Sequence, residues 1–239
     1  MTIIGSGTVG NSLAKAMGIE ALGKSEEKVE DDVVIICTPT LTIDGVQDLS
    51  EVKQALGGIT EAKLVIIRST ILPGTTEQLQ GTTDIPIIFV PEFGFEDTMY
   101  DDLKNPDYYL IGITEKSQNM TDLAIKILPP AKSYEVMLAT EAEFAKYFTN
   151  IWGCFQVTLA NTLYDWAGEY YDKALRGALK HKNLPKWGWK ILDRGFRGYS
   201  GKCLPKDIKA GISATDNVIW KVIDNYNEKL LEENVSSSR

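Results

Sequence analysis

The sequence predicts an α/β fold in which a part built around a sheet is followed by a helical part. Short β-branched runs alternate with helical patterns through the first half of the chain, which is typical of βαβ units whose parallel strands are buried on both faces. After about Met137 the strand signals give way to a long helical pattern crowded with aromatic residues. We therefore expect a Rossmann-like, doubly wound parallel sheet in residues 1–137 and an α-helical domain in residues 138–239.

The predicted elements follow from these patterns in chain order. The β-branched runs predict strands at Thr2–Ile4, Val33–Cys37, Leu64–Arg68, Ile87–Val90 and Tyr109–Ile113, with a weaker strand near Ile19–Leu22. The helical patterns predict helices at Asn11–Met17, Glu51–Leu56 and Thr121–Ile127. In the second domain we expect one continuous helix over Glu141–Leu179 and another over Lys206–Leu231.

The first of these long helices is apolar on most of its sides, with aromatic residues such as Phe148, Trp152 and Trp166 along it. Such a helix must be buried within its own chain or against a second copy. We therefore expect the helical domain to mediate dimerisation, and the partner to be a second copy of this chain.

The charge balance excludes several classes of function. The formal net charge of -8 argues against binding to nucleic acid or to an anionic membrane, because both need a cationic surface. No apolar run approaches the roughly 20 residues of a membrane span, and the start MTIIGSG lacks the layout of a signal peptide. The expected location is the cytoplasm.

The cysteines do not predict a metal site. Cys37, Cys154 and Cys203 are far apart and lack the C-x-x-C pairing of zinc and redox sites. Cys37 ends an apolar strand and Cys154 lies in an apolar helix, so both fit core positions. The single histidine, His181, lies in the polar stretch KHKN, where a solvated loop is expected. Proton transfer then falls to carboxylates, lysine or cysteine.

The string GSGTVG fits G-x-G-x-x-G between a predicted strand and a predicted helix. Gly5 permits the tight turn, Gly7 lets the backbone approach a pyrophosphate, and Gly10 allows close packing of the helix. The helix N-terminus attracts phosphates, and Thr8 and Val9 complete the predicted contact. Glycine turns also occur for steric reasons alone, but this context favours a dinucleotide-binding domain.

The identity of the dinucleotide stays open at this point. The fingerprint calls for an acidic residue about 20 residues further on, to hold the ribose hydroxyls. The weak second strand instead leads into Gly23, Lys24 and Ser25. Lys24 suits the 2′-phosphate of NADP, or it is merely a solvated turn residue. NAD and NADP are therefore both candidates.

Two turns that follow predicted strands are candidate ligand sites, because open α/β sheets bind ligands at the carboxyl ends of their strands. Ser69 and Thr70 follow one strand, and Glu92 and Glu96 follow the next. The same residues also fit an ordinary turn and a solvated loop.

Lys146 and Asn150 are four residues apart in EAEFAKYFTN and so share one face of the helix. Such a pair usually faces solvent. Here the surrounding residues are so apolar that the pair either lines a polar cavity or is buried unpaired at a cost in free energy.

The string GYSGKCLPKD places Cys203 in a loop bounded by glycines and flanked by Lys202 and Lys206. Nearby cations favour the thiolate, which is the nucleophilic form of cysteine. Asp207 falls at the start of the following helix, close enough to position a water molecule or the lysine. Its alternative role is that of a helix N-terminal charge without chemistry.

In their order along the chain, these motifs resemble the UDP-glucose/GDP-mannose dehydrogenase family. The resemblance rests on GSGTVG, DDVVIICTPT, STILPGTT, PEF with Glu96, AEFAKYFTN and KCLPKD. It covers the chain from Gly5 to the helix after Asp207. It implies a nucleotide-sugar substrate, UDP-glucose foremost, whose C6 alcohol loses two hydrides to two NAD in succession.

The resemblance also implies a role for each matching residue. Cys203 is the implied nucleophile, which captures the aldehyde as a thiohemiacetal that becomes a thioester. Lys146 and Asn150 stabilise oxyanions, and Asp207 supports the water and the lysine. The residues implied in water and proton handling are Thr70, Glu92 and Glu96, and those implied at the cofactor are Gly5, Gly7, Thr8, Val9, Gly10, Thr38, Pro39 and Thr70. Lys24 joins the cofactor candidates only through its place after the weak second strand.

The sequence departs from the family pattern in three places. The stretch between the glycine loop and DDVVIICTPT is short, and GFED follows PEF in place of the usual Leu-Arg-Glu-Gly type of continuation. The family also carries a third, carboxyl-terminal domain, and this sequence ends where that domain would begin. The alternative function is that of an NAD(P)-binding regulatory module without turnover.

Overall fold

The computed structural model describes residues 1–23, 28–193 and 195–237 and divides into two compact units. The first unit comprises Met1–Ile43 and Gln47–Lys146, and the second comprises Asp44–Val46 and Tyr147–Arg239. Lys24, a candidate for contact with a ribose phosphate, lies outside the described residues.

A seven-stranded sheet forms the centre of the first unit, in the order β11-β10-β9-β8-β4-β1-β2. The run β9, β8, β4, β1 and β2 is parallel, and β1 lies between β2 and β4, so the winding reverses beside β1. This confirms the predicted Rossmann-like fold. The strands are β1 (Thr2–Ile4), β2 (Ala21–Leu22), β4 (Val33–Ile36), β8 (Leu64–Ile67), β9 (Ile87–Phe89), β10 (Tyr108–Ile113) and β11 (Ser133–Leu138).

The last two strands depart from the prediction of a wholly parallel sheet. β10 pairs with β9 in antiparallel register, and β11 then runs parallel to β10. Side chains alternate in the same way in parallel and antiparallel strands, so the sequence could not predict the direction of β10. The sequence also did not predict β11. Two-stranded pairs outside the sheet join β3 (Val29–Glu30) to β7 (Ile59–Glu61), and β5 (Thr42–Ile43) to β6 (Val46–Gln47).

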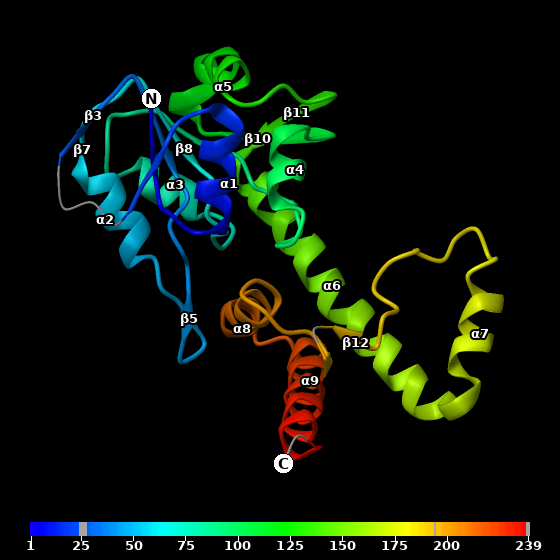
Figure 1. Ribbon diagram of the computed structural model, residues 1–239. Helices are drawn as coiled ribbons and strands as arrows, with labels where there is room; N and C mark the ends of the chain where they lie inside the picture. Colours follow the sequence, from blue (N-terminus) through cyan, green and yellow to red (C-terminus); the bar gives the residue numbers. More distant parts are fainter. Residues whose placement is uncertain (24–27, 194, 238–239) are drawn as a thin grey trace. The chain divides into compact units, whose positions relative to one another are not determined.

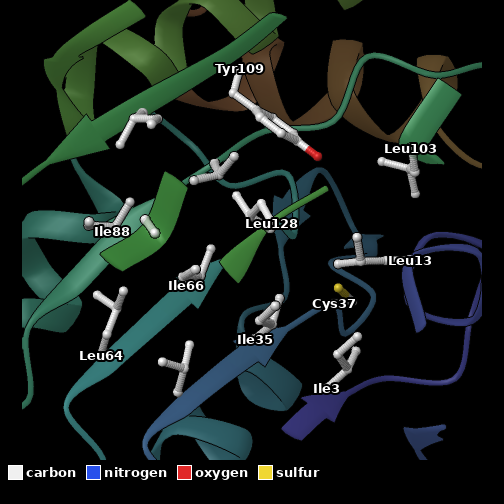
Figure 2. Packing of buried hydrophobic residues seen from close by; sticks show 14 of the residues in the cluster. Ile3, Leu13, Ile35, Cys37, Leu64, Ile66, Ile88, Leu103, Tyr109 and Leu128 are labelled. Carbon is white, nitrogen blue, oxygen red and sulfur yellow. The ribbon is translucent and has the colours of Figure 1, made fainter. Parts of the chain in front are cut away.

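Helices cover both faces of the sheet (Figure 1). Ile3, Ile35 and Ile66 point to one face, where they pack in a buried cluster with Leu13 and Leu103 (Figure 2). That face carries α1 (Thr8–Met17), α4 (Met99–Lys104) and α5 (Thr121–Ile127), the last preceded by a 3-10 turn, Glu115–Met120. The opposite face carries α2 (Ser50–Gly58), α3 (Thr75–Gln80) and the start of α6 (Ala139–Ala167).

The second unit is mainly helical, but neither of its predicted long helices is continuous. The aromatic helix ends with α6, and a 3-10 turn, Gly168–Tyr170, separates it from α7 (Tyr171–Ala178). Gly168 has a φ of 53°, which a right-handed helix does not allow. The last helix is split into α8 (Leu204–Thr215) and α9 (Val218–Ser237), with a small hairpin of β12 (Leu192–Asp193) and β13 (Phe196–Arg197) before them.

The break between α8 and α9 has a local cause. Asp216 adopts a left-handed φ of 55°, and the Asn217 side chain accepts a hydrogen bond from the backbone N–H of Ile219 at 3.0 Å. An asparagine that binds the N–H two residues on begins a new helix. In the part of the chain that the structure describes, none of the helices has the length and hydropathy needed to cross a bilayer.

Glu143 joins the start of α6 to the start of α3. Its carboxylate accepts hydrogen bonds from the backbone N–H groups of Gly74 and Thr76, at 2.5 and 2.7 Å, and from the Thr76 hydroxyl at 2.6 Å. The side chain is fully buried. Burial raises the pKa of Glu143, and the three hydrogen bonds oppose that rise. One buried carboxylate thus satisfies two N–H groups at the beginning of α3.

We predict that Glu143→Gln lowers the free energy of unfolding by about 1–3 kcal/mol at pH 4.5, because one acceptor is replaced by a donor. The loss should be smaller at pH 7.5. A carboxyl whose pKa is raised in the folded state adds stability below its unfolded pKa, and that stability is lost as the pH rises through its folded pKa.

Urea unfolding at the two pH values measures this difference. Glu135→Gln is the matched control, since it removes the same charge from an exposed position of β11, and it should show little effect at either pH. A deficit in Glu143→Gln that grows with pH would contradict the prediction.

Candidate dinucleotide and thiol sites

The glycine loop between β1 and α1 is closed on two sides and open on one. Gly5 has a φ of 112°, and a Cβ there would lie 2.6 Å from the Cys37 carbonyl. A Cβ on Gly10 would lie 1.7 Å from the carbonyl oxygen of Gly5. A Cβ on Gly7, by contrast, would meet nothing within 4 Å. Gly5 and Gly10 are therefore required by packing, whereas Gly7 leaves room for a ligand.

The residues beside this opening fit a dinucleotide. Gly7 is the N-cap of α1, and the following residues Thr8 and Val9 bring backbone N–H groups to a helix N-terminus, which favours phosphate. Thr38 follows β4, next to β1, and its buried hydroxyl has no hydrogen-bond partner among the described residues. Pro39, beside it, is exposed.

The turns after β4 and β8 are tied to each other. The Ser69 hydroxyl donates to the Thr38 carbonyl at 2.6 Å, and the Thr40 hydroxyl donates to the Thr70 carbonyl at 2.6 Å. Gln47 adds a second donor to the Thr70 carbonyl at 3.2 Å. The structure thus holds Thr38 and Thr70, which the sequence placed separately, in neighbouring turns at the carboxyl edge of the sheet.

Lys146 is buried, as one of the two alternatives predicted, but it is paired, which the sequence did not predict. Its Nζ lies 3.2 Å from Oε1 of Glu92, and both side chains are 6% exposed. Oε2 of Glu92 accepts a hydrogen bond from the Gly94 N–H at 3.0 Å, and the Lys146 ammonium lies 5.3 Å from the centre of the Phe93 ring. Glu96 is exposed. Of the two candidate carboxylates, the structure thus gives Glu92 a buried ammonium as its partner.

In the second unit, Asn150 and Asp207 form a buried polar cluster at the start of α8. The Asn150 amide donates to Oδ2 of Asp207 at 2.6 Å, and Lys206 binds Oδ1 of the same carboxylate at 2.5 Å. Asp207 is buried, and Cys203 is the N-cap of α8, one helical turn earlier. The structure therefore brings together three residues from the two motifs of this unit.

Tyr199, which the sequence analysis did not single out, anchors the loop that leads to Cys203. Its hydroxyl donates to Asp224 at 3.0 Å, and its backbone exchanges hydrogen bonds with the Asn227 side chain at 2.7 and 2.9 Å. Gly198 precedes it with a φ of 87°, so no β-branched side chain fits there. The spacing of Asp224 and Asn227 on one face of α9 was the signal available in the sequence.

The three thiols differ in their surroundings. Burial raises the pKa of Cys37 to about 12 and raises the pKa of Cys154 further. Cys203 is exposed at the N-terminus of a helix, and that end of a helix carries partial positive charge. Cys203 is therefore the thiol most accessible to a reagent.

A glycine loop at the point where the winding of a mostly parallel sheet reverses defines the first unit as a dinucleotide-binding domain. Residues 21–128 match the family model described as UDP-glucose/GDP-mannose dehydrogenase family, NAD binding domain. The match agrees with the family resemblance that the motifs indicated, and the domain that the family model describes binds NAD.

Similarity to individual proteins extends beyond the matched domain. The chain is 29% identical over 210 residues to a UDP-N-acetyl-D-mannosamine dehydrogenase of Pyrococcus horikoshii, covering 78% of this chain and 49% of that protein. It is 27% identical over 213 residues to a UDP-glucose 6-dehydrogenase of Pseudomonas aeruginosa, covering 80% and 46%. The chain thus spans about half the length of these curated relatives.

The fold is shared with a solved structure of a UDP-glucose dehydrogenase from the archaeon Pyrobaculum islandicum. The TM-score is 0.78 at 21% identity, and the match covers 98% of this chain and 71% of that one. The likeness includes the helical part that follows the sheet.

We predict that Gly10→Ala destabilises the protein by about 3 kcal/mol or more, because the added methyl group overlaps the carbonyl oxygen of Gly5. Gly7→Ala is the matched control, with a negative φ of -77° and open space around it, and should cost about 1 kcal/mol or less. Urea unfolding measures both variants. Equal midpoints for the two would show that α1 does not need its close approach to β1.

Proposed function

We propose that this chain is an NAD-dependent nucleotide-sugar dehydrogenase, which oxidises the C6 alcohol of a UDP-sugar to the uronic acid. The observation that carries the proposal is the exposed Cys203 thiol at the start of α8, next to the cluster of buried Asn150 and Asp207 with half-buried Lys206, in a chain whose residues 21–128 match this family's NAD-binding domain. UDP-glucose is the favoured substrate.

The residues proposed to hold the cofactor are those of the glycine loop and of the turns after β4 and β8. Gly7 and the α1 N-terminus suit the pyrophosphate, while Thr38, Pro39 and Thr70 border the same edge of the sheet. NAD supplies the hydride acceptor for both oxidations when it is bound. The NADP alternative depends on Lys24, and the affinity of Lys24→Asp for the two cofactors would decide it.

The proposed chemistry uses Cys203 as a covalent catalyst. The first oxidation removes a hydride and a proton from the C6 alcohol and leaves an aldehyde. The Cys203 thiolate adds to the aldehyde carbon, and the alkoxide takes up the proton released in the first oxidation to give a thiohemiacetal. Loss of a second hydride with this hydroxyl proton then gives a thioester. Water then adds to the thioester carbon, and the thiolate leaves with formation of the carboxylate. Covalent capture divides one difficult oxidation into easier steps and retains the aldehyde.

Other side chains are proposed to assist. Lys146 and Asn150 each present donors to an oxyanion, and such stabilisation is often worth several kcal/mol in acyl transfer. Asp207 holds the Asn150 amide at 2.6 Å, which fixes its orientation. Thr70, Glu92 and Glu96 are proposed to handle water and protons.

The test is the formation of reduced cofactor and uronic acid from UDP-glucose. Cys203→Ser should abolish release of the acid, because a hydroxyl is a far weaker nucleophile than a thiolate at neutral pH, while the affinity for NAD stays unchanged. Gly7→Val should instead abolish NAD binding, which calorimetry measures. The wild-type protein treated with iodoacetamide should be alkylated first at Cys203, as mass spectrometry would show.

Acid formation by Cys203→Ser at the wild-type rate would exclude the covalent mechanism. A wild-type protein that binds NAD but turns over none of UDP-glucose, UDP-galactose, GDP-mannose or UDP-N-acetyl sugars would favour the NAD-binding regulatory module instead.

The protein is further proposed to act as a homodimer through α6. Four apolar side chains in the second unit, Phe148, Trp152, Leu159 and Trp166, recur at spacings of four and seven residues and so share one side of the helix. They are exposed in the single chain, Trp166 to 86%. Aromatic side chains that recur on an exposed helix side are typical of an interface.

We predict that sedimentation detects a dimer, and that Leu159→Glu raises its dissociation constant at least about 10-fold, because a charge would be buried without a partner. Val136→Glu, an equivalent change at an exposed position of β11, is the matched control and should leave the dimer intact. A wild-type protein that stays monomeric at about 100 times its assay concentration would refute the proposal.

A further inference from the structure

A pocket of about 260 Å³ lies in the first unit, between the loop after β9 and the segment that leads into β10. Its lining includes Arg68, Phe95 and Tyr109, together with the carboxylates of Glu92, Asp102 and Asp107. One water molecule occupies roughly 30 Å³ of liquid volume. The pocket therefore has room for a small polar molecule and its hydration water.

Arg68 is the unusual group in this lining. It follows β8 and is 2% exposed, and side chains alternate along a strand, so it points to the same face as Ile66. Its Nε, Nη1 and Nη2 atoms have no hydrogen-bond acceptor among residues 1–23, 28–193 and 195–237. Its guanidinium lies 5.5 Å from the centre of the Tyr109 ring, which stands on the same face (Figure 2).

The carboxylates that line the pocket have partners other than Arg68. Glu92 pairs with Lys146 and accepts from the Gly94 N–H. Asp107 pairs with Lys132. Asp102 accepts from the Phe95 N–H at 3.2 Å and from the Thr98 hydroxyl at 2.6 Å. Lysine already neutralises two of these three carboxylates, and none of the three is bonded to Arg68 in the described structure.

Arginine cannot relieve this situation by losing its proton, because its guanidinium stays charged in proteins. A buried charge is costly unless it is paired and hydrogen-bonded, so Arg68 calls for an acceptor that the described residues do not supply. The Tyr109 hydroxyl, also buried, has no partner within the described residues either. The chain therefore offers a planar fork of N–H donors and one phenolic O–H donor, and none of these atoms makes a hydrogen bond within the described residues, although the neighbouring Arg68 guanidinium lowers the pKa of Tyr109 against the effect of burial.

We propose that this pocket binds a small oxyanion, of the carboxylate or phosphate class, through the guanidinium of Arg68 and the hydroxyl of Tyr109. Guanidinium recognises both kinds of anion through paired N–H···O bonds. The site is separate from the glycine loop, since Gly5, Gly7 and Gly10 do not line it, and it does not depend on the proposed dehydrogenase activity.

Calorimetry and thermal unfolding with sodium acetate, sodium phosphate or sodium sulfate test the proposal, with sodium chloride at matched ionic strength as the reference. At least one oxyanion should raise the unfolding midpoint by about 3 °C at ten times its dissociation constant. The anion that raises the unfolding midpoint most shows whether the pocket prefers a planar carboxylate or a tetrahedral phosphate or sulfate.

Arg68→Met should abolish the oxyanion effect, and Tyr109→Phe should weaken the affinity roughly 3- to 10-fold by removing one donor. Arg176→Met, which removes an equal charge from the exposed face of α7, is the matched control and should bind as the wild type does. Gly7→Val should abolish NAD binding and leave oxyanion binding unchanged. The experiment therefore tests the dinucleotide site and the oxyanion site independently.

No oxyanion-specific stabilisation of the wild type would overturn the proposal. So would an unchanged affinity in Arg68→Met. If Arg68→Met does not fold, an unchanged affinity in Tyr109→Phe overturns it instead.

Discussion

The buried ion pair between Glu92 and Lys146 is the interaction on which the arrangement of the first unit depends. It joins the loop after β9 to α6, two segments 54 residues apart in the sequence. Removing one partner of such a pair leaves an uncompensated buried charge, which typically costs 3–5 kcal/mol. One helical turn earlier, Glu143 binds the start of α3. These two contacts fix where the first part of α6 lies against the sheet, and Lys146 takes its position from both.

Local patterns were sufficient to predict the sheet of the first unit. The fully buried runs Val33–Ile36 and Leu64–Ile67 consist of Val, Ile and Leu, and buried parallel strands have that composition. The packing roles of Gly5 and Gly10 were also predictable, because each follows from the steric demands of one turn, while the approach of Gly7 to a pyrophosphate stays a prediction. The direction of β10 was not, since the alternation of its side chains is the same in either direction.

The sequence did not predict the contacts that depend on pairing between distant segments. Lys146 was recognised as an unusual lysine, but the sequence gives no means to choose Glu92 as its partner over other carboxylates. The same holds for Asn150 with Asp207 and for Tyr199 with Asp224. The helix breaks at Gly168 and Asp216 were missed for a different reason, because one left-handed residue interrupts a periodicity that otherwise continues on both sides. Lys24 remains a sequence-based candidate.

The hydroxyl-to-carbonyl bonds between the turns after β4 and β8 have a consequence for recognition. Ser69 and Thr40 each hold the carbonyl of the opposite turn at 2.6 Å, so both turns are fixed by the protein itself. Loops that become ordered only on contact with a ligand subtract their conformational entropy from the affinity. Here that entropy is lost when the chain folds, and more of the interaction energy at this edge of the sheet is left for discrimination between ligands of similar shape.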